Sequence, residues 1–205
     1  MTALASSGRE SAADPYDPLG DLFVAQFARP SDLLPVNLRA LTPFQRSLLV
    51  IDGTVTKFLE AFTLQPVDVD LISQETRVLT ESHEWLEAET KTTVIAREVV
   101  LRGRYDRVLH AHAASLLVLE RLPVPVQNGL NTNPGGLGRI LLESKLETRR
   151  EVLWYGRQRS NHPRAGELSG REFLTRTYRI ISSGRPLMLI NEQFPMPDDL
   201  LPSHE

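Results

Sequence analysis

The order of apolar and polar positions along the chain predicts helices first and then strands joined by tight turns. Helical patterns lie at residues 41–53, 55–62 and 137–145, and a short helix is expected within the Pro-, Asn- and Gly-rich stretch 123–136. Alternating or β-branched runs predict strands at 67–73, 92–103, 107–119, 148–157, 172–182 and 187–195. Because short turns such as 102–106 and 183–186 favour antiparallel hairpins, we predict an α+β domain with an antiparallel β-sheet and helices packed on one side.

The first two helices carry recognisable start signals. Thr42 can act as N-cap, Pro43 suits the first helical position, and Gln45 completes a capping box. Thr54 is expected to cap the second helix in the same way.

Composition at the two ends and in two internal stretches predicts the domain organisation. Residues 1–35 are expected to form a flexible tail and lead-in, residues 36–197 the folded domain, and residues 198–205 a C-terminal tail. The polar stretch 74–91 predicts a loop with a helical turn, and 158–170 predicts a polar loop.

Composition narrows the functional classes. The 205 residues are 41% hydrophobic and 24% charged, values typical of one globular domain with a real core. A net charge of −3 disfavours an electrostatic nucleic-acid binder, and the lack of cysteine excludes disulfides, Cys-ligated metal sites and thiol catalysis. No apolar run reaches the roughly 18–20 residues of a membrane helix, and the first residues lack signal-peptide features, so we expect a cytoplasmic protein.

Glu192 is an anomaly in the last predicted strand. Side chains of an extended chain alternate between faces, which places Glu192 with Met188, Ile190 and Phe194 on the more apolar face. A buried carboxylate needs a cation, a hydrogen-bond donor or a proton. Glu192 is therefore either a pocket residue or a strand-end residue that reaches solvent.

Arg97 presents the same anomaly in another strand. It is the sole charge on the face that carries Ile95, Val99 and Leu101, while Glu98 lies on the opposite face. Because the sheet can bury either face, the pattern alone does not choose between Arg97 and Glu98. If buried, Arg97 either forms a structural ion pair with Glu192 or grips a ligand carboxylate with its two-pronged guanidinium.

Two further sequence patterns resemble functional motifs only weakly. His110 and His112 share a strand face, but no third ligand sits at a telling spacing, so a metal site is disfavoured. The sequence GGLGR (135–139) lacks the lysine and spacing of a phosphate loop and predicts a turn or flap.

Five stretches taken together resemble the chorismate pyruvate-lyase (4-hydroxybenzoate synthase) family, particularly its branch from bacteria that make phenolic compounds. In order from about residue 40 to 195 they are LLVIDGTVTKFLEAF, AREVVLRG, AHAASLLVLERLP, GGLGRILLES and TRTYRIISSGRPLMLINEQFP. The resemblance implies an antiparallel sheet backed by helices, with a closed internal ligand pocket. It has little counterpart in the loop 158–170 and the first 35 residues.

The resemblance also implies site residues. Arg97 would bind the substrate carboxylate, and Glu192 would meet the ring hydroxyl; this implication favours Arg97 over Glu98. Leu137 matches the flap position whose backbone amide contacts the ligand, and Val55 stands where family members carry Met.

The implied reaction converts chorismate to 4-hydroxybenzoate and pyruvate. It requires no metal, cofactor or covalent nucleophile, and Glu192 either orients the hydroxyl or assists proton transfer. The implied partners are the small-molecule substrate and product, with no nucleic acid or membrane, in a monomer or small homo-oligomer. The product would feed quinone or phenolic metabolite biosynthesis.

Two alternatives stay open at this point. The same fold serves transcription regulators as an effector-binding domain, so the chain could be a non-catalytic binding module for an aromatic acid. We find no helix-turn-helix segment or basic recognition helix in favour of a regulator. A lyase acting on an amino analogue of chorismate would carry the same site residues.

Overall fold

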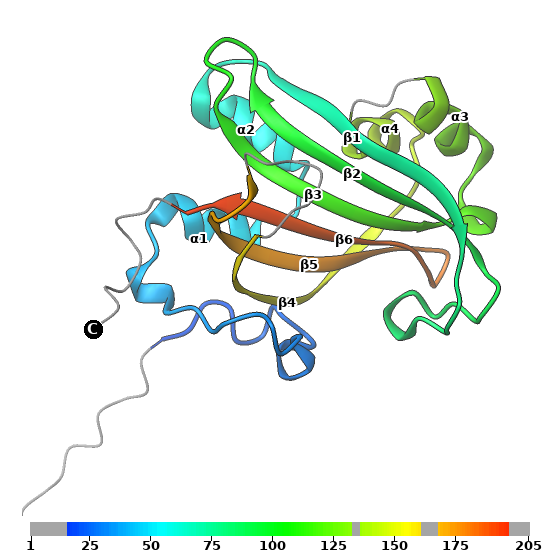
Figure 1. The fold of residues 1–205 in the computed structure, drawn as a ribbon, viewed down its shortest axis with the longest axis horizontal. Coiled ribbons are helices and arrows are strands. Elements are labelled where there is room, and N and C mark those ends of the chain that lie inside the picture. Colours follow the sequence, from blue (N-terminus) through cyan, green and yellow to red (C-terminus); the bar gives the residue numbers. More distant parts are fainter. Residues whose placement is uncertain (1–15, 133–135, 161–167, 197–205) are drawn as a thin grey trace, which may run out of the picture.

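A six-stranded antiparallel sheet forms the framework of the described part of the chain. The computed structural model describes residues 16–132, 136–160 and 168–196. The strand order is β1-β2-β3-β6-β5-β4 (Figure 1). The strands are β1 (Val67–Val78), β2 (Thr93–Gly103), β3 (Leu109–Val118), β4 (Arg149–Arg159), β5 (Glu172–Ser182) and β6 (Arg185–Pro195).

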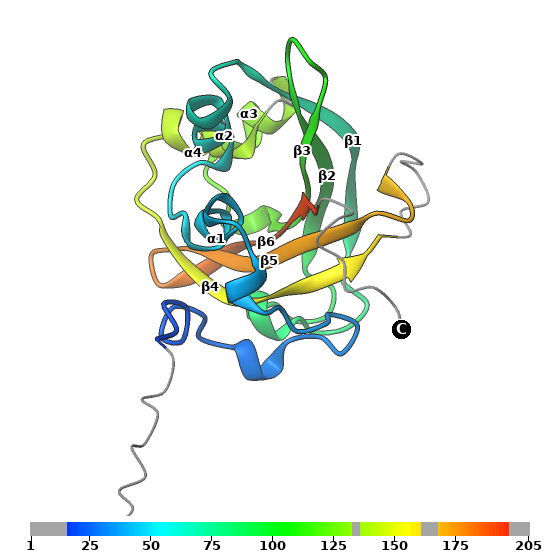
Figure 2. The same ribbon diagram turned by 90° about the vertical axis from the view of Figure 1, so that its left-hand side faces the viewer.

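The α-helices of the described residues all lie on one face of this curved sheet (Figure 2). They are α1 (Pro43–Val50), α2 (Val55–Thr63), α3 (Val124–Thr132) and α4 (Leu137–Glu143). Short 3-10 turns complete the described elements: η1 (Gln26–Ala28), η2 (Leu38–Ala40), η3 (Glu84–Leu86) and η4 (Leu119–Arg121). The predicted α+β class, with helices on one side of an antiparallel sheet, is confirmed. None of the described helices is long and apolar enough to span a bilayer.

The stretch predicted as a loop at 74–91 is partly strand. β1 continues to Val78, and its last residues stay in register with β2, from Gln74 opposite Arg97 to Val78 opposite Thr93. This end of β1 is an exposed sheet edge, so it lacks the apolar alternation by which strands are recognised. The predicted helical turn is present as η3.

The predicted N-terminal caps of α1 and α2 differ in how well they match the structure. The capping box of α1 is confirmed: the Gln45 amide donates to Thr42 Oγ1 at 3.2 Å, and the Thr42 amide donates to Gln45 Oε1 at 2.8 Å. Thr54 occupies the predicted N-cap position of α2, but its side chain makes no capping hydrogen bond there. That side chain lies against Gly138, where a Cβ would come within 2.6 Å of Thr54 Cγ2. Glycine therefore permits close contact between the starts of α2 and α4.

The lead-in before α1 packs along β4, the edge strand of the sheet. The Val24 and Ala25 amides each donate to β4 carbonyls at 3.0 Å, and Leu34 forms a bridge with Arg157. This pairing covers most of an edge that would otherwise expose unpaired backbone groups. The described part of the predicted tail, from residue 16, is thus anchored to the domain, with Leu19, Phe23, Ala25 and Leu33 buried. Residues 1–15 and 197–205 lie outside the described residues, and the domain bounds 36–197 stay a prediction.

Two apolar clusters fill the space between the sheet and the helices. One joins α1 and α2 to Leu101, Leu174 and Phe194. The other joins α3 and α4 to Tyr178 and Ile190. The candidate site lies where these two clusters meet.

A glycine in β4 tests whether the lead-in is packed in solution. A Cβ at Gly156 would lie 3.0 Å from both Leu33 Cβ and the Leu34 carbonyl oxygen. We expect Gly156→Val to lower the free energy of unfolding by about 1–3 kcal/mol, because the lead-in must move to make room. Urea unfolding measures the change. Arg149→Val, at an exposed position of the same strand, is the control, and equal stability of the two variants would contradict the packing.

Candidate functional site

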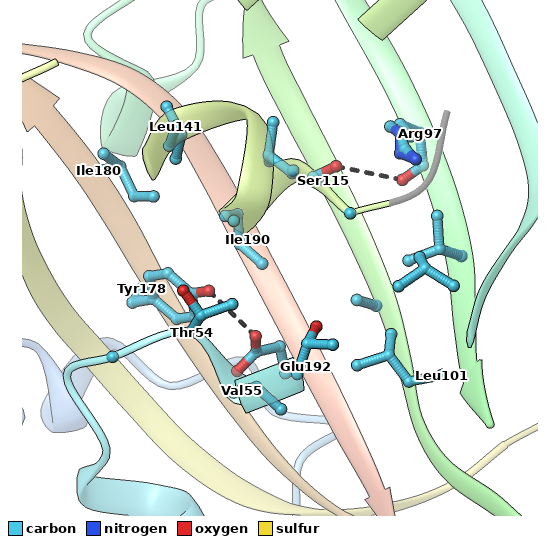
Figure 3. A pocket seen from close by; sticks show the side chains of 18 of the residues that line it. Thr54, Val55, Arg97, Leu101, Ser115, Leu141, Tyr178, Ile180, Ile190 and Glu192 are labelled. Carbon is cyan, nitrogen blue, oxygen red and sulfur yellow. Dashed lines mark hydrogen bonds between the residues drawn. The ribbon is translucent and has the colours of Figure 1, made fainter. Parts of the chain in front are cut away.

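A largely apolar cavity of about 80 Å³ lies between the sheet and the starts of α2 and α4. All six strands contribute residues to its lining, and the segments 53–56 and 136–141 cover it (Figure 3). The charged side chains in its lining, among the described residues, are Arg97, Arg150 and Glu192. The cavity can therefore hold a small, mostly apolar ligand that carries negative charge.

Arg97 lies on the buried face of β2. It is 2% exposed, and Val99 and Leu101 of the same face also line the cavity. Glu98 is only half-buried and does not line this cavity. The sequence pattern did not decide which face of β2 is buried, and the structure shows that it is the face carrying Arg97. Burial lowers the pKa of the Arg97 guanidinium, since desolvation disfavours its charged form.

Glu192 is also buried, at 7% exposure, and its carboxylate is held by two donors from β5. Arg176 Nε donates to Oε2 at 2.8 Å, and the Tyr178 hydroxyl donates to Oε1 at 3.0 Å. Arg176 stands directly opposite Glu192 in the β5–β6 register. The interpretation of Glu192 as an exposed strand-end residue is wrong. Its ion-pair partner is Arg176, so the alternative of a structural pair with Arg97 is wrong as well.

Arg97 and Glu192 lie apart on one continuous sheet surface. Arg97 pairs with Ser115 of β3, Ser115 pairs with Ile190 of β6, and Glu192 follows two residues later. The two residues are thus separated by two strand spacings, roughly 10 Å across the sheet. Figure 3 shows them on different sides of the cavity, with Ile190 and Ser115 between them. This separation leaves room for a ligand that contacts both.

Arg176 connects the site to α1. Its Nη1 donates to the carbonyl oxygens of Leu49 and Ile51, at 3.2 and 2.8 Å, at the C-terminal end of that helix. Its guanidinium carbon lies 5.2 Å from the centre of the Tyr178 ring, within cation–π range. Burial and the neighbouring Glu192 carboxylate raise the pKa of Tyr178, so the phenol stays protonated and continues to donate.

The two remaining predicted site residues begin the helices that cover the cavity. Val55 is the first residue of α2 and is 5% exposed, and Leu137 is the first residue of α4. Both line the cavity with Arg97 and Glu192. Gly136 precedes Leu137 with φ of +84°, a conformation that favours glycine. The structure thus brings all four predicted positions to one cavity.

The histidine pair lies elsewhere. His112 is buried, with Nδ1 3.3 Å from Gln193 Oε1, and neither His110 nor His112 lines the cavity. Over the described ranges, no three His, Cys, Asp or Glu side chains gather closely enough to hold a metal ion.

Sequence reasoning missed three polar residues of the site region: Arg176, Tyr178 and Arg150. Arg176 shares a strand face with Leu174, Tyr178 and Ile180, so the signal of a lone charge on an apolar face was available there. Arg150 was harder to find, because a bulge between Val152 and Trp154 interrupts the alternation of β4.

Comparison with known proteins identifies the family to which the chain is similar. The family model "Chorismate pyruvate-lyase Rv2949c-like" matches residues 49–200. Proteins named chorismate pyruvate-lyase from Mycobacterium tuberculosis H37Rv and Mycobacterium leprae are each 28% identical to the chain, over 163 and 161 residues. Each match covers 77% of this chain, with 82% of the first relative and 76% of the second.

Solved structures share the fold at low sequence identity. The effector domain of PhnF from Mycobacterium smegmatis matches with a TM-score of 0.54 and 13% identity, over 70% of this chain and 88% of that one. Another structure, of PhnF from the same organism, matches with a TM-score of 0.55 and 12% identity, over 75% and 67% of the two chains. These likenesses establish the fold alone.

The Arg176–Glu192 pair makes a stability prediction. Arg176→Met would leave the Glu192 carboxylate buried without its cation, so we expect the free energy of unfolding to fall by about 3–5 kcal/mol. The double variant Arg176→Met/Glu192→Met should be more stable than Arg176→Met alone, since it removes both charges. Urea unfolding of the single and double variants measures this coupling.

Arg179→Met is the matched control for that experiment. Arg179 lies on the same strand but pairs with Glu87 and Glu151 nearer solvent, so its loss should cost less. Losses that simply add in the double variant would show that the buried pair is not coupled.

Proposed function

The chain belongs to the chorismate pyruvate-lyase family, and from that premise we propose that it converts chorismate to 4-hydroxybenzoate and pyruvate. The observation that carries the proposal is the placement of two buried ionisable residues, Arg97 and Glu192, on different sides of one apolar cavity. Chorismate has matching groups: a ring carboxylate at C1 and a hydroxyl at C4, at opposite ends of a six-membered ring.

The reaction needs orientation more than reactive protein groups. The C3–O ether bond breaks, the C4 proton leaves, and the ring becomes aromatic as 4-hydroxybenzoate. The departing enolpyruvyl group takes up one proton in place of its bond to the ring and becomes pyruvate, so atoms and charge balance. In this proposal the C4 proton passes to the leaving group, and the protein supplies a fixed geometry and excludes water.

Arg97 would hold the ring carboxylate. A guanidinium offers two parallel donors to a carboxylate, and the pair is strong where water is excluded. Burial lowers the pKa of the Arg97 guanidinium, because desolvation disfavours its charged form. A bound carboxylate would favour that charged form, which supports a role in binding.

Glu192 would accept a hydrogen bond from the C4 hydroxyl. Each of its oxygens already accepts one hydrogen bond, from Arg176 or Tyr178, and retains capacity for another. The two donors fix the carboxylate in place before substrate arrives. Val55 and Leu137 would contact the ring and close the site, with the Leu137 amide near the ligand.

Effector domains share this fold, so catalysis needs a direct assay. Purified protein is incubated with chorismate, and 4-hydroxybenzoate and pyruvate are quantified. We expect equimolar formation of both products. A folded protein that binds 4-hydroxybenzoate and forms neither product would instead support the alternative of a non-catalytic binding module. Parallel incubation with the 4-amino analogue of chorismate distinguishes the hydroxyl substrate from an amine.

Variants at the two ends of the cavity test the residue roles. We expect Arg97→Ala to lower kcat/KM at least about 100-fold, because a buried charge-paired anchor is lost. Glu192→Gln should lower kcat/KM about 10-fold if the carboxylate only orients the hydroxyl. A fall in kcat of about 100-fold or more would assign it proton transfer as well.

Glu98→Gln is the control, since Glu98 neighbours Arg97 but does not line the cavity. Wild-type turnover by a folded Arg97→Ala variant would contradict the site.

A further inference from the structure

Arg150 is a cavity-lining cation that the proposed reaction has not yet used. It enters from β4, and its side chain is 21% exposed. Its guanidinium carbon lies 5.9 Å from the centre of the Tyr178 ring, and the Tyr178 hydroxyl donates to Glu192. Arg150 therefore lies near the Glu192 end of the cavity.

The charge of Arg150 is only weakly compensated. Its Nη1 donates to the Asp52 carbonyl oxygen at 2.5 Å, which orients the side chain without neutralising it. The nearest carboxylate, that of Asp52, is 3.8 Å away, and its side chain is 86% exposed, where solvent screens the attraction. Among the described residues, the buried Nε of Arg150 has no hydrogen-bond partner. The guanidinium thus retains capacity for an anion.

The substrate of the proposed reaction has a second carboxylate that needs a partner. Chorismate is a dianion, with one carboxylate on C1 and another on the enolpyruvyl group at C3. If the C4 hydroxyl meets Glu192, the adjacent C3 substituent must lie beside that end of the cavity. A further cavity of about 160 Å³, lined by Arg150, Arg176 and Tyr178, adjoins this end and offers space beyond the ring.

From these observations we propose that Arg150 binds the enolpyruvyl carboxylate and so makes the site selective for the dianionic substrate over its monoanionic product. The proposal rests on the proposed function and deepens it. Arg97 and Arg150 would hold the two carboxylates, and Glu192 would hold the C4 hydroxyl, across the ring from Arg97 and beside the C3 substituent. Once the C3–O bond breaks, the carboxylate bound to Arg150 belongs to pyruvate, and 4-hydroxybenzoate keeps only its contacts with Arg97 and Glu192.

The test compares two ligands that differ in this carboxylate. One is 4-hydroxybenzoate. The other is 3-(1-carboxyvinyloxy)-4-hydroxybenzoate, a stable aromatic dianion that cannot react further. We expect Arg150→Gln to weaken the dianion about 10- to 100-fold, as for a lost charge-assisted hydrogen bond, and to leave 4-hydroxybenzoate within about two-fold. Titration calorimetry measures both dissociation constants, and kcat/KM for chorismate should fall with the dianion affinity.

Two further variants separate recognition from structure. Arg150→Lys keeps the positive charge and should recover part of the dianion affinity. Arg149→Gln removes the neighbouring exposed arginine of the same strand and should change neither ligand. Arg150→Gln that weakens both ligands equally, or neither, overturns the assignment. If the proposed function itself is wrong, the wild-type protein will not turn over chorismate, and this result is distinct from the binding results for the variants.

Discussion

The buried contact between Arg176 and Glu192 is the interaction on which the site depends. Removing two charges from water costs several kcal/mol per ion, and direct pairing with additional hydrogen bonds is what offsets that cost. Here the extra hydrogen bonds come from Tyr178 and from two carbonyls at the end of α1. One arginine therefore orients the carboxylate of the cavity and fixes the helix that leads into the cover.

The sheet that forms the floor of the site and the helices that cover it hold their residues in different ways. Arg97, Tyr178 and Glu192 stand on three strands, β2, β5 and β6, of one hydrogen-bonded sheet, so their mutual spacing is set by backbone geometry. Val55 and Leu137 stand at the first turns of short helices that approach each other through Gly138. The sheet floor fixes the positions of the polar groups, and the helical cover closes the cavity. This arrangement suits a reaction that depends on holding a substrate in one conformation away from water.

Much of this arrangement could be predicted from local pattern. The capping box located α1, and the search for a lone charge on an apolar strand face brought out Glu192 and the strand of Arg97. The preference for Arg97 over Glu98, and the positions Val55 and Leu137, came from the family resemblance. The partner of Glu192 was not found, because it depends on register. Counting from the β5–β6 turn, where Ser182 pairs with Arg185, would place Arg176 opposite Asn191. A bulge between Ile180 and Ile181 shifts the pairing by one residue and brings Arg176 opposite Glu192. Such a bulge leaves no clear mark in the sequence.

The lead-in along β4 has a consequence for how the chain folds. Gln26 exchanges hydrogen bonds with the backbone of Tyr155, a separation of 129 residues. Contacts between such distant positions require closure of a long loop before they form, and chains rich in them fold slowly. During synthesis the lead-in emerges long before β4 exists to receive it. The lead-in therefore has no strand to pair with until β4 has left the ribosome, and until then its backbone groups are open to other chains.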